Sequence, residues 1–116
     1  MVDIDNDGWV DIALTGPSIQ LYRNTGDGQF EEGRSLVVEE GQYHNYGMAW
    51  GDIDGDADLD LIVTGYEMGR HFALWRNDGG MNFTQITDEA GIQGDVGGRG
   101  AVFSDLDHDG DLDLYI

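Results

Sequence analysis

The sequence lacks cysteine and lysine and has a single proline among its 116 residues. Without cysteine there is neither a disulfide framework nor a thiolate metal site. No apolar run approaches the roughly 18 residues of a transmembrane helix, so we expect no membrane insertion. The first residues carry no basic-then-apolar segment of the signal-peptide kind. We therefore expect one domain at most, resting on a modest hydrophobic core.

Positive charge is scarce, because five arginines face 24 acidic residues and the formal net charge is -19. Nucleic acids and anionic membrane surfaces require a basic face, so we expect neither as a partner. Most of the acidic residues lie in three short stretches, at 3–11, 52–60 and 105–113. Charge clustered in this way indicates local sites, which leaves cations and neutral polar partners as candidate ligands.

The acidic stretches belong to an internal repeat. Asp52 follows Asp3 by 49 residues, and Asp105 follows Asp52 by 53. A second motif recurs in the same register, because Leu-Tyr-Arg-Asn at 21–24 returns as Leu-Trp-Arg-Asn at 74–77. A period of this length is typical of propeller blades.

Four short strands are predicted within one repeat, at 47–51, 59–64, 72–76 and 82–86. The sequence Asn-Asp-Gly-Gly at 77–80 is a strong hairpin signal between the last two strands. We therefore predict an all-β partial β-propeller with four-stranded antiparallel blades, whose acidic loops join the first and second strands.

On this plan the chain holds about one full blade, at 46–98, plus two partial blades, at 1–45 and 99–116. A propeller closes with about 4 to 8 blades. The chain is therefore expected to be a fragment of a larger propeller, joined by the remaining blades of a parent chain, or a unit that self-assembles.

Each acidic loop offers oxygen ligands in an alternating pattern. Counted from the first aspartate, positions 1, 3, 5 and 9 offer carboxylates, and position 7 offers its backbone carbonyl. A set of oxygen donors without histidine or cysteine suits Ca²⁺ best, ahead of Mg²⁺ or Mn²⁺. The predicted ligands are Asp3, Asp5, Asp7, Trp9 and Asp11 in the first loop; Asp52, Asp54, Asp56, Asp58 and Asp60 in the second; and Asp105, Asp107, Asp109, Asp111 and Asp113 in the third.

The loops differ from an EF-hand, because position 12 is Leu14, Val63 or Ile116 where that motif has a bidentate glutamate. Position 6 is glycine in the outer loops but Ala57 in the second, which predicts some distortion of the second site. Solvated acidic turns without an ion are the alternative. Three copies in register, each followed by an apolar strand, favour metal sites.

The remaining notable residues receive structural interpretations. Arg23 and Arg76, each followed by asparagine, are predicted to tie a hairpin or a neighbouring loop. The loop at 43–46, Tyr-His-Asn-Tyr, is the candidate for ligand contact. Aromatic residues at strand positions are predicted to pack within or between sheets: Tyr22, Phe30, Trp50, Phe72, Trp75, Phe83 and Phe103. Nucleophile, phosphate-binding and zinc motifs are missing, so we expect no enzyme activity.

Two segments, Gly-Met-Ala-Trp-Gly-Asp-Ile-Asp-Gly-Asp-Ala-Asp-Leu-Asp-Leu-Ile-Val and Leu-Trp-Arg-Asn-Asp-Gly-Gly-Met-Asn-Phe, resemble the FG-GAP or VCBS repeat. Such repeats form the calcium-loop blades of integrin-α-like propellers and of many bacterial surface proteins. The resemblance implies calcium in each loop, an extracellular setting, and a non-catalytic role in adhesion, scaffolding, or binding of a protein or carbohydrate ligand. The alternative is a fragment of a propeller-containing enzyme acting on polysaccharide, either a lyase or a hydrolase.

Overall fold

The computed structural model describes residues 2–37, 45–65, 72–92 and 99–116. In these ranges the chain consists of β-strands, turns and connecting segments, so the prediction of an all-β fold is confirmed. These ranges also contain no helix that is long and apolar enough to cross a membrane.

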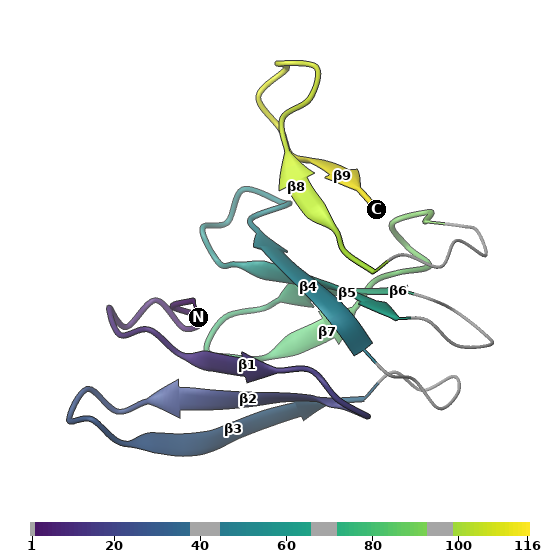
Figure 1. Cartoon of the computed structure of the whole chain (residues 1–116). Coiled ribbons are helices and arrows are strands. Elements are labelled where there is room, and N and C mark those ends of the chain that lie inside the picture. Colours follow the sequence, from purple (N-terminus) through teal and green to yellow (C-terminus); the bar gives the residue numbers. More distant parts are fainter. Residues whose placement is uncertain (1, 38–44, 66–71, 93–98) are drawn as a thin grey trace.

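The strands form three antiparallel sheets that follow one another in chain order (Figure 1). The first sheet is β1-β2-β3, the second is β4-β5-β6-β7, and the third is the pair β8-β9. The strand bounds are β1 Ile12–Leu14, β2 Ile19–Asn24, β3 Phe30–Leu36, β4 Asn45–Gly51, β5 Asp60–Gly65, β6 Phe72–Asn77, β7 Phe83–Gln85, β8 Val102–Ser104 and β9 Asp113–Tyr115. The four strands predicted for one repeat are β4 to β7, each within two residues of its predicted bounds.

The repeat in the sequence is also a repeat of strands. By position in the repeat, β1, β2 and β3 correspond to β5, β6 and β7, while β8 and β9 correspond to β4 and β5. The acidic stretch at 52–60 joins β4 to β5, and the stretch at 105–113 joins β8 to β9. All three acidic stretches therefore occupy the same place relative to their sheets.

The hydrophobic core lies between the sheets and follows the two-residue period of the strands. In β2, Ile19 and Leu21 are fully buried against the second sheet, while Gln20 and Tyr22 between them are only partly buried. This first cluster consists of Ile4, Ile19, Leu21 and Leu36 with Leu61, Val63, Ala73, Trp75, Met81 and Phe83. The first and second sheets are therefore packed face to face.

A second hydrophobic cluster lies on the opposite face of β5 and β6. It joins Ile62, Phe72 and Leu74 of the second sheet to partly buried residues that include Phe103 and Leu114 of the third. Because neighbours cover both of its faces, β5 is buried along its whole length. An apolar cavity of about 430 Å³ remains at this interface. Its lining includes Ile53, Phe72, Leu74, Leu112, Leu114 and Ile116.

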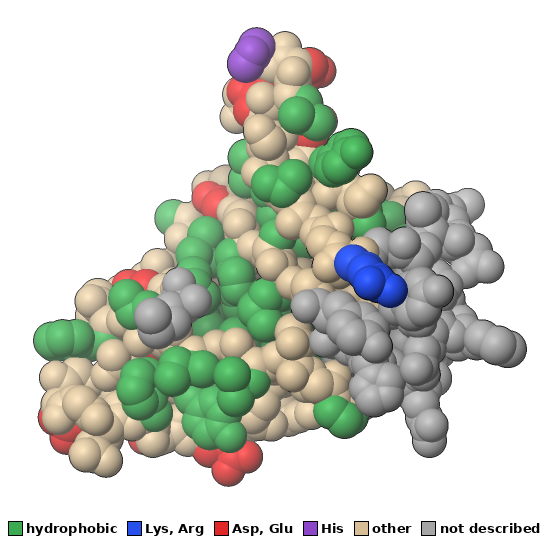
Figure 2. Space-filling view, in the orientation of Figure 1, with side chains coloured by type: hydrophobic (Ala, Val, Ile, Leu, Met, Phe, Trp, Pro, Cys, Tyr) green, Lys and Arg blue, Asp and Glu red, His purple; other side chains and the backbone are tan. Residues whose placement is uncertain are grey.

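The aromatic residues of the second sheet pack as predicted. Phe72, Trp75 and Phe83 are buried, and Phe83 meets Trp50 edge to face, with ring centroids 6.2 Å apart. The prediction is wrong for Phe30, which is 46% exposed although it corresponds to Phe83 in the repeat. Phe30 pairs with Asn24, on the face of the first sheet opposite Ile19 and Leu21, and no other described sheet covers that face. Figure 2 shows hydrophobic side chains exposed over the first sheet, at the lower left of the view.

The two equivalent phenylalanines allow a matched test of this packing. Phe83→Ala removes a buried ring from the first cluster and should lower the free energy of unfolding by about 3 to 5 kcal/mol. Phe30→Ala should lower it by about 0.5 kcal/mol, because the ring is half exposed. Urea denaturation of both variants measures the difference, and equal losses would contradict the face-to-face packing of the first two sheets.

Candidate metal centres

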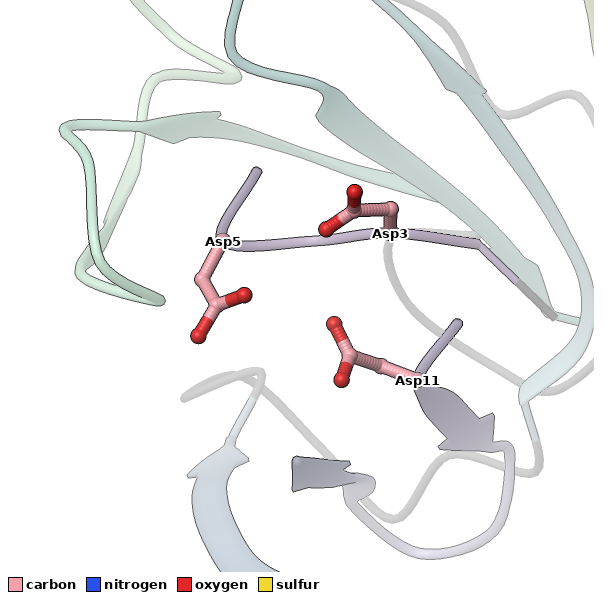
Figure 3. A group of neighbouring side chains, drawn as sticks. All are labelled: Asp3, Asp5 and Asp11. Carbon is pink, nitrogen blue, oxygen red and sulfur yellow. The ribbon is translucent and has the colours of Figure 1, made fainter. Parts of the chain in front are cut away.

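Each acidic loop brings the aspartates of positions 1, 3 and 9 together. One carboxylate oxygen of each lies within 4.8 Å of an oxygen of the other two. The groups are Asp3, Asp5 and Asp11; Asp52, Asp54 and Asp60; and Asp105, Asp107 and Asp113. In the first group the three carboxylates point toward a common space (Figure 3). The same three of the predicted ligands are thus assembled in every loop.

The aspartate at position 9 anchors the loop to its sheet. Asp11 is fully buried, and its Oδ2 accepts the amide of Ile4 at 2.8 Å. Its Oδ1 accepts the amide of Asn24, at the end of β2, also at 2.8 Å. One carboxylate therefore fixes the start of the loop, the start of β1 and the end of β2 relative to one another.

Asp60 repeats this arrangement in the second loop. It is fully buried and accepts the amides of Ile53 and Asn77, both at 2.8 Å. Burial raises the pKa of Asp60, the two amides oppose that rise, and the negative charges of Asp54 and Asp56 add to it. A nearby cation would favour the ionised form, since it offsets both the burial and the neighbouring charges.

The aspartate at position 1 holds the turn of the loop. Asp3 Oδ2 accepts the amide of Gly8 at 3.0 Å, whereas Asp3 Oδ1 is buried and accepts no hydrogen bond from any of the described residues. A buried carboxylate oxygen without a donor is costly, because it has lost water and gained nothing in return. A hard cation would supply that partner, so the residues of the first loop fit calcium.

The aspartates at position 5 have a different local role. They lie outside the three-carboxylate groups, and the Oδ1 of each accepts the amide two residues further on. The pairs are Asp7 with Trp9 at 2.9 Å, Asp56 with Asp58 at 2.8 Å, and Asp109 with Asp111 at 3.2 Å. These bonds occupy one lone pair on one of the two oxygens, so position 5 stays a predicted ligand alongside the carbonyl of position 7.

Each loop needs a left-handed backbone at two places, positions 4 and 6. Sequence reasoning identified position 6 but missed position 4. The φ angles at positions 4 and 6 are 58° at Asn6 and 91° at Gly8, 78° at Gly55 and 75° at Ala57, and 63° at His108 and 102° at Gly110. Every loop therefore has one glycine at these two positions, and the second loop has it at position 4.

The predicted distortion of the second site is found in its backbone, at Ala57, while its three carboxylates are grouped as in the other loops. Asp52, Asp54 and Asp60 meet the same 4.8 Å limit as their counterparts. Gly55 adopts one of the two left-handed conformations without strain, and Ala57 adopts the other. The consequence is local backbone strain at Ala57, with the carboxylate group intact.

Two substitutions test where this strain lies. Ala57→Gly relieves the left-handed alanine and should raise the free energy of unfolding by up to about 1 kcal/mol. Gly55→Ala introduces the same strain at position 4 and should lower it by about 1 kcal/mol. Urea denaturation in the presence of a chelator measures both, and a loss of stability in Ala57→Gly would contradict the interpretation.

Asparagine side chains connect the loops, a role that sequence reasoning did not assign. Asn77 Nδ2 donates to the carbonyl of Leu59 in its own loop at 3.3 Å and to that of Ile4 in the first loop at 3.0 Å. Asn24 Nδ2 makes the equivalent bond within the first loop, to the carbonyl of Val10 at 3.0 Å. The recurrence of asparagine after arginine is the sequence signal from which this pair could have been found.

A third asparagine joins the first two loops directly. Asn6 Nδ2 donates to the carbonyl of Ala57 at 3.0 Å and to Asp58 Oδ1 at 2.8 Å. Position 4 is Asn6, Gly55 or His108 in the three loops, so the internal repeat gave no sign of this bond. The first two candidate centres are therefore held side by side by Asn6 and Asn77.

The two recurring arginines tie a loop and a hairpin, as predicted. Arg23 Nε lies 2.5 Å from Asp5 Oδ2, and its Nη2 lies 2.6 Å from Asp7 Oδ2. Arg76 Nε instead lies 2.8 Å from Asp78 Oδ1, in the hairpin between β6 and β7. A hydrogen bond to Asp5 raises the pKa of Arg23, and a hydrogen bond to Asp78 raises the pKa of Arg76, so both arginines stay charged.

The candidate ligand loop at 43–46 stays a prediction. Tyr43 and His44 lie outside the described residues, as do the side chains of Asn45 and Tyr46.

Strands and loops together define the class of this protein: an all-β repeat protein with an acidic loop at the same place in each repeat. A family profile described as FG-GAP-like repeat matches residues 3–63 and again residues 52–116. The chain therefore belongs to the FG-GAP-like repeat family, which confirms the resemblance seen in the sequence. Neither the curated proteins nor the solved structures provide a match.

Proposed function

We propose that the chain is a calcium-binding, non-catalytic repeat module of an extracellular β-propeller that serves adhesion, ligand binding or scaffolding. The observation that carries this proposal is the assembly of the same three carboxylates in each of three loops. The buried Asp3 Oδ1 atom, which has no hydrogen-bond donor within the described part of the chain, adds a specific demand for a cation in the first loop.

Simple electrostatics explains why an ion would matter. Carboxylates held within 4.8 Å of one another repel, and their repulsion grows as water is excluded from the loop. Calcium accepts six to eight oxygen ligands in flexible geometry, which suits carboxylates supplemented by a backbone carbonyl. When bound, the ion would supply the positive charge that offsets this repulsion.

The propeller arrangement is supported by the way in which the sheets stack. Ile4 of the first acidic loop and Ile19 and Leu21 of β2 face the second sheet, and their repeat counterparts Ile53, Phe72 and Leu74 face the third. The same face of each sheet thus meets the next one along the chain, as blades do. The partly open second interface would accept further strands, from a parent chain or from another copy.

An extracellular setting is consistent with the chemistry of the loops. Extracellular modules bind calcium with dissociation constants of about 10⁻⁴ to 10⁻³ M, near the calcium concentration outside cells. A site of this affinity would be substantially filled there. The ligand class we propose for the assembled module is a protein or a carbohydrate.

Calcium should stabilise the fold. At about 1 mM calcium each site should add roughly 0.4 to 1.4 kcal/mol to the free energy of unfolding, because only the folded state assembles the ligands. The melting temperature should rise with calcium and fall again with a chelator, as followed by circular dichroism.

A pair of variants gives the matched control. Asp54→Ala removes a grouped carboxylate and should lower the calorimetric calcium stoichiometry by one, whereas Glu89→Ala, an exposed acid outside the loops, should not change it. An unchanged melting temperature together with no heat of calcium binding would refute the proposed function.

A further inference from the structure

The two recurring arginines occupy equivalent positions in β2 and β6 but neutralise different acids. Arg23 bridges the position-3 and position-5 aspartates of the first loop, Asp5 and Asp7. Arg76 forms its ion pair with Asp78, which belongs to the hairpin and is not a predicted ligand. One candidate centre therefore contains a protein cation within ion-pair distance of its ligands, while the equivalent arginine of the next repeat pairs with the hairpin and interacts with Asp54 and Asp60 of its loop only at longer range.

Two sequence differences between the repeats explain why Arg23 and Arg76 have different partners. Asp78 stands where the first repeat has Thr25, and it offers Arg76 a carboxylate two residues away. The other oxygen of Asp78 accepts the Thr84 hydroxyl at 2.5 Å, which holds it in place. In the first repeat Glu31 stands in place of Thr84, and its carboxylate lies 3.4 Å from Arg23 Nη1.

We propose that Arg23 is a built-in counter-ion of the first loop, which weakens calcium binding there and keeps that loop formed when calcium is scarce. This inference rests on the proposed function. It predicts that the first and second loops differ in affinity, with calcium filling the second loop at the lower concentration.

The physical argument concerns competition for the same oxygens. Asp5 belongs to the grouped carboxylates, and its side chain is only 10% exposed beneath the guanidinium. Charge-assisted hydrogen bonds from one planar guanidinium to two carboxylates fix both in geometry, so an incoming ion has to share or displace them. The first loop also carries one acid fewer, because position 7 is Trp9 in place of Asp58.

Terbium, a calcium substitute that luminesces when a nearby tryptophan is excited, can report on the first loop. Trp9 occupies position 7 of that loop, and the second centre lies beside it, so the signal that is lost in Trp9→Phe but kept in Asp54→Ala belongs to the first site. In Arg23→Gln the half-saturating terbium concentration of this signal should fall roughly fivefold, the size expected for partly exposed ion pairs. In the matched variant Arg76→Gln it should change by less than about twofold.

A second measurement addresses the role of Arg23 without the ion. Arg23→Gln should lower the melting temperature in chelator more than in saturating calcium, since only the ion-free loop depends on the guanidinium. Arg23→Lys keeps the positive charge but loses the planar guanidinium that binds two carboxylates at once. Its half-saturating terbium concentration and its melting temperature in chelator should therefore lie between those of the wild type and Arg23→Gln. If Arg23→Gln does not fold, Arg23→Lys carries the test on its own.

The outcomes separate this inference from the proposed function. If the wild type binds terbium and calcium, and the first-site affinity is unchanged or weaker in Arg23→Gln, the counter-ion role is refuted while the calcium module stands. If neither ion binds to the wild type or to any variant, the proposed function itself fails.

Discussion

The other features of the structure depend on the hydrogen bonds that the buried aspartate at position 9 accepts from the backbone. Asp11 and Asp60 each accept two backbone amides, one from the start of the acidic loop and one from the end of the third strand of the repeat. A buried carboxylate is tolerated only where donors or a cation compensate it. The same group thus holds the sheet together and gives the loop its most deeply placed oxygen ligands.

Asparagines extend this local arrangement into contacts between repeats. The backbone amide of Asn77 donates to Asp60, and its side-chain amide donates to the carbonyl of Ile4. The backbone amide of Ile4 in turn donates to Asp11. The two anchoring aspartates are therefore connected through only two residues. Together with the first hydrophobic cluster, these bonds set the spacing of the first two loops. The same contacts therefore hold the sheets and the candidate centres in place.

Much of the fold and of the candidate sites was predictable from the sequence, because each motif recurs and its copies can be compared. Strand positions follow from turn residues and from the two-residue alternation of apolar side chains, both of which are local. The alternate aspartates identified the loops for a similar reason. Position 4 was missed because its left-handed backbone is compatible with Asn6, Gly55 and His108, three residue types that share no obvious pattern.

The sequence by itself determined the class of fold, the three acidic loops and the oxygen chemistry that they offer. These depend on spacing and residue type within a few positions of one another. Tertiary structure alone decided which carboxylates meet, how Asn6 and Asn77 link two loops, and that Arg23 and Arg76 hold different partners. Identical residues in equivalent strands have different partners because Asp78 binds Arg76 in the hairpin, whereas Arg23 has Glu31 beside it and binds Asp5 and Asp7 of its loop, and such a choice among carboxylates is settled only in three dimensions.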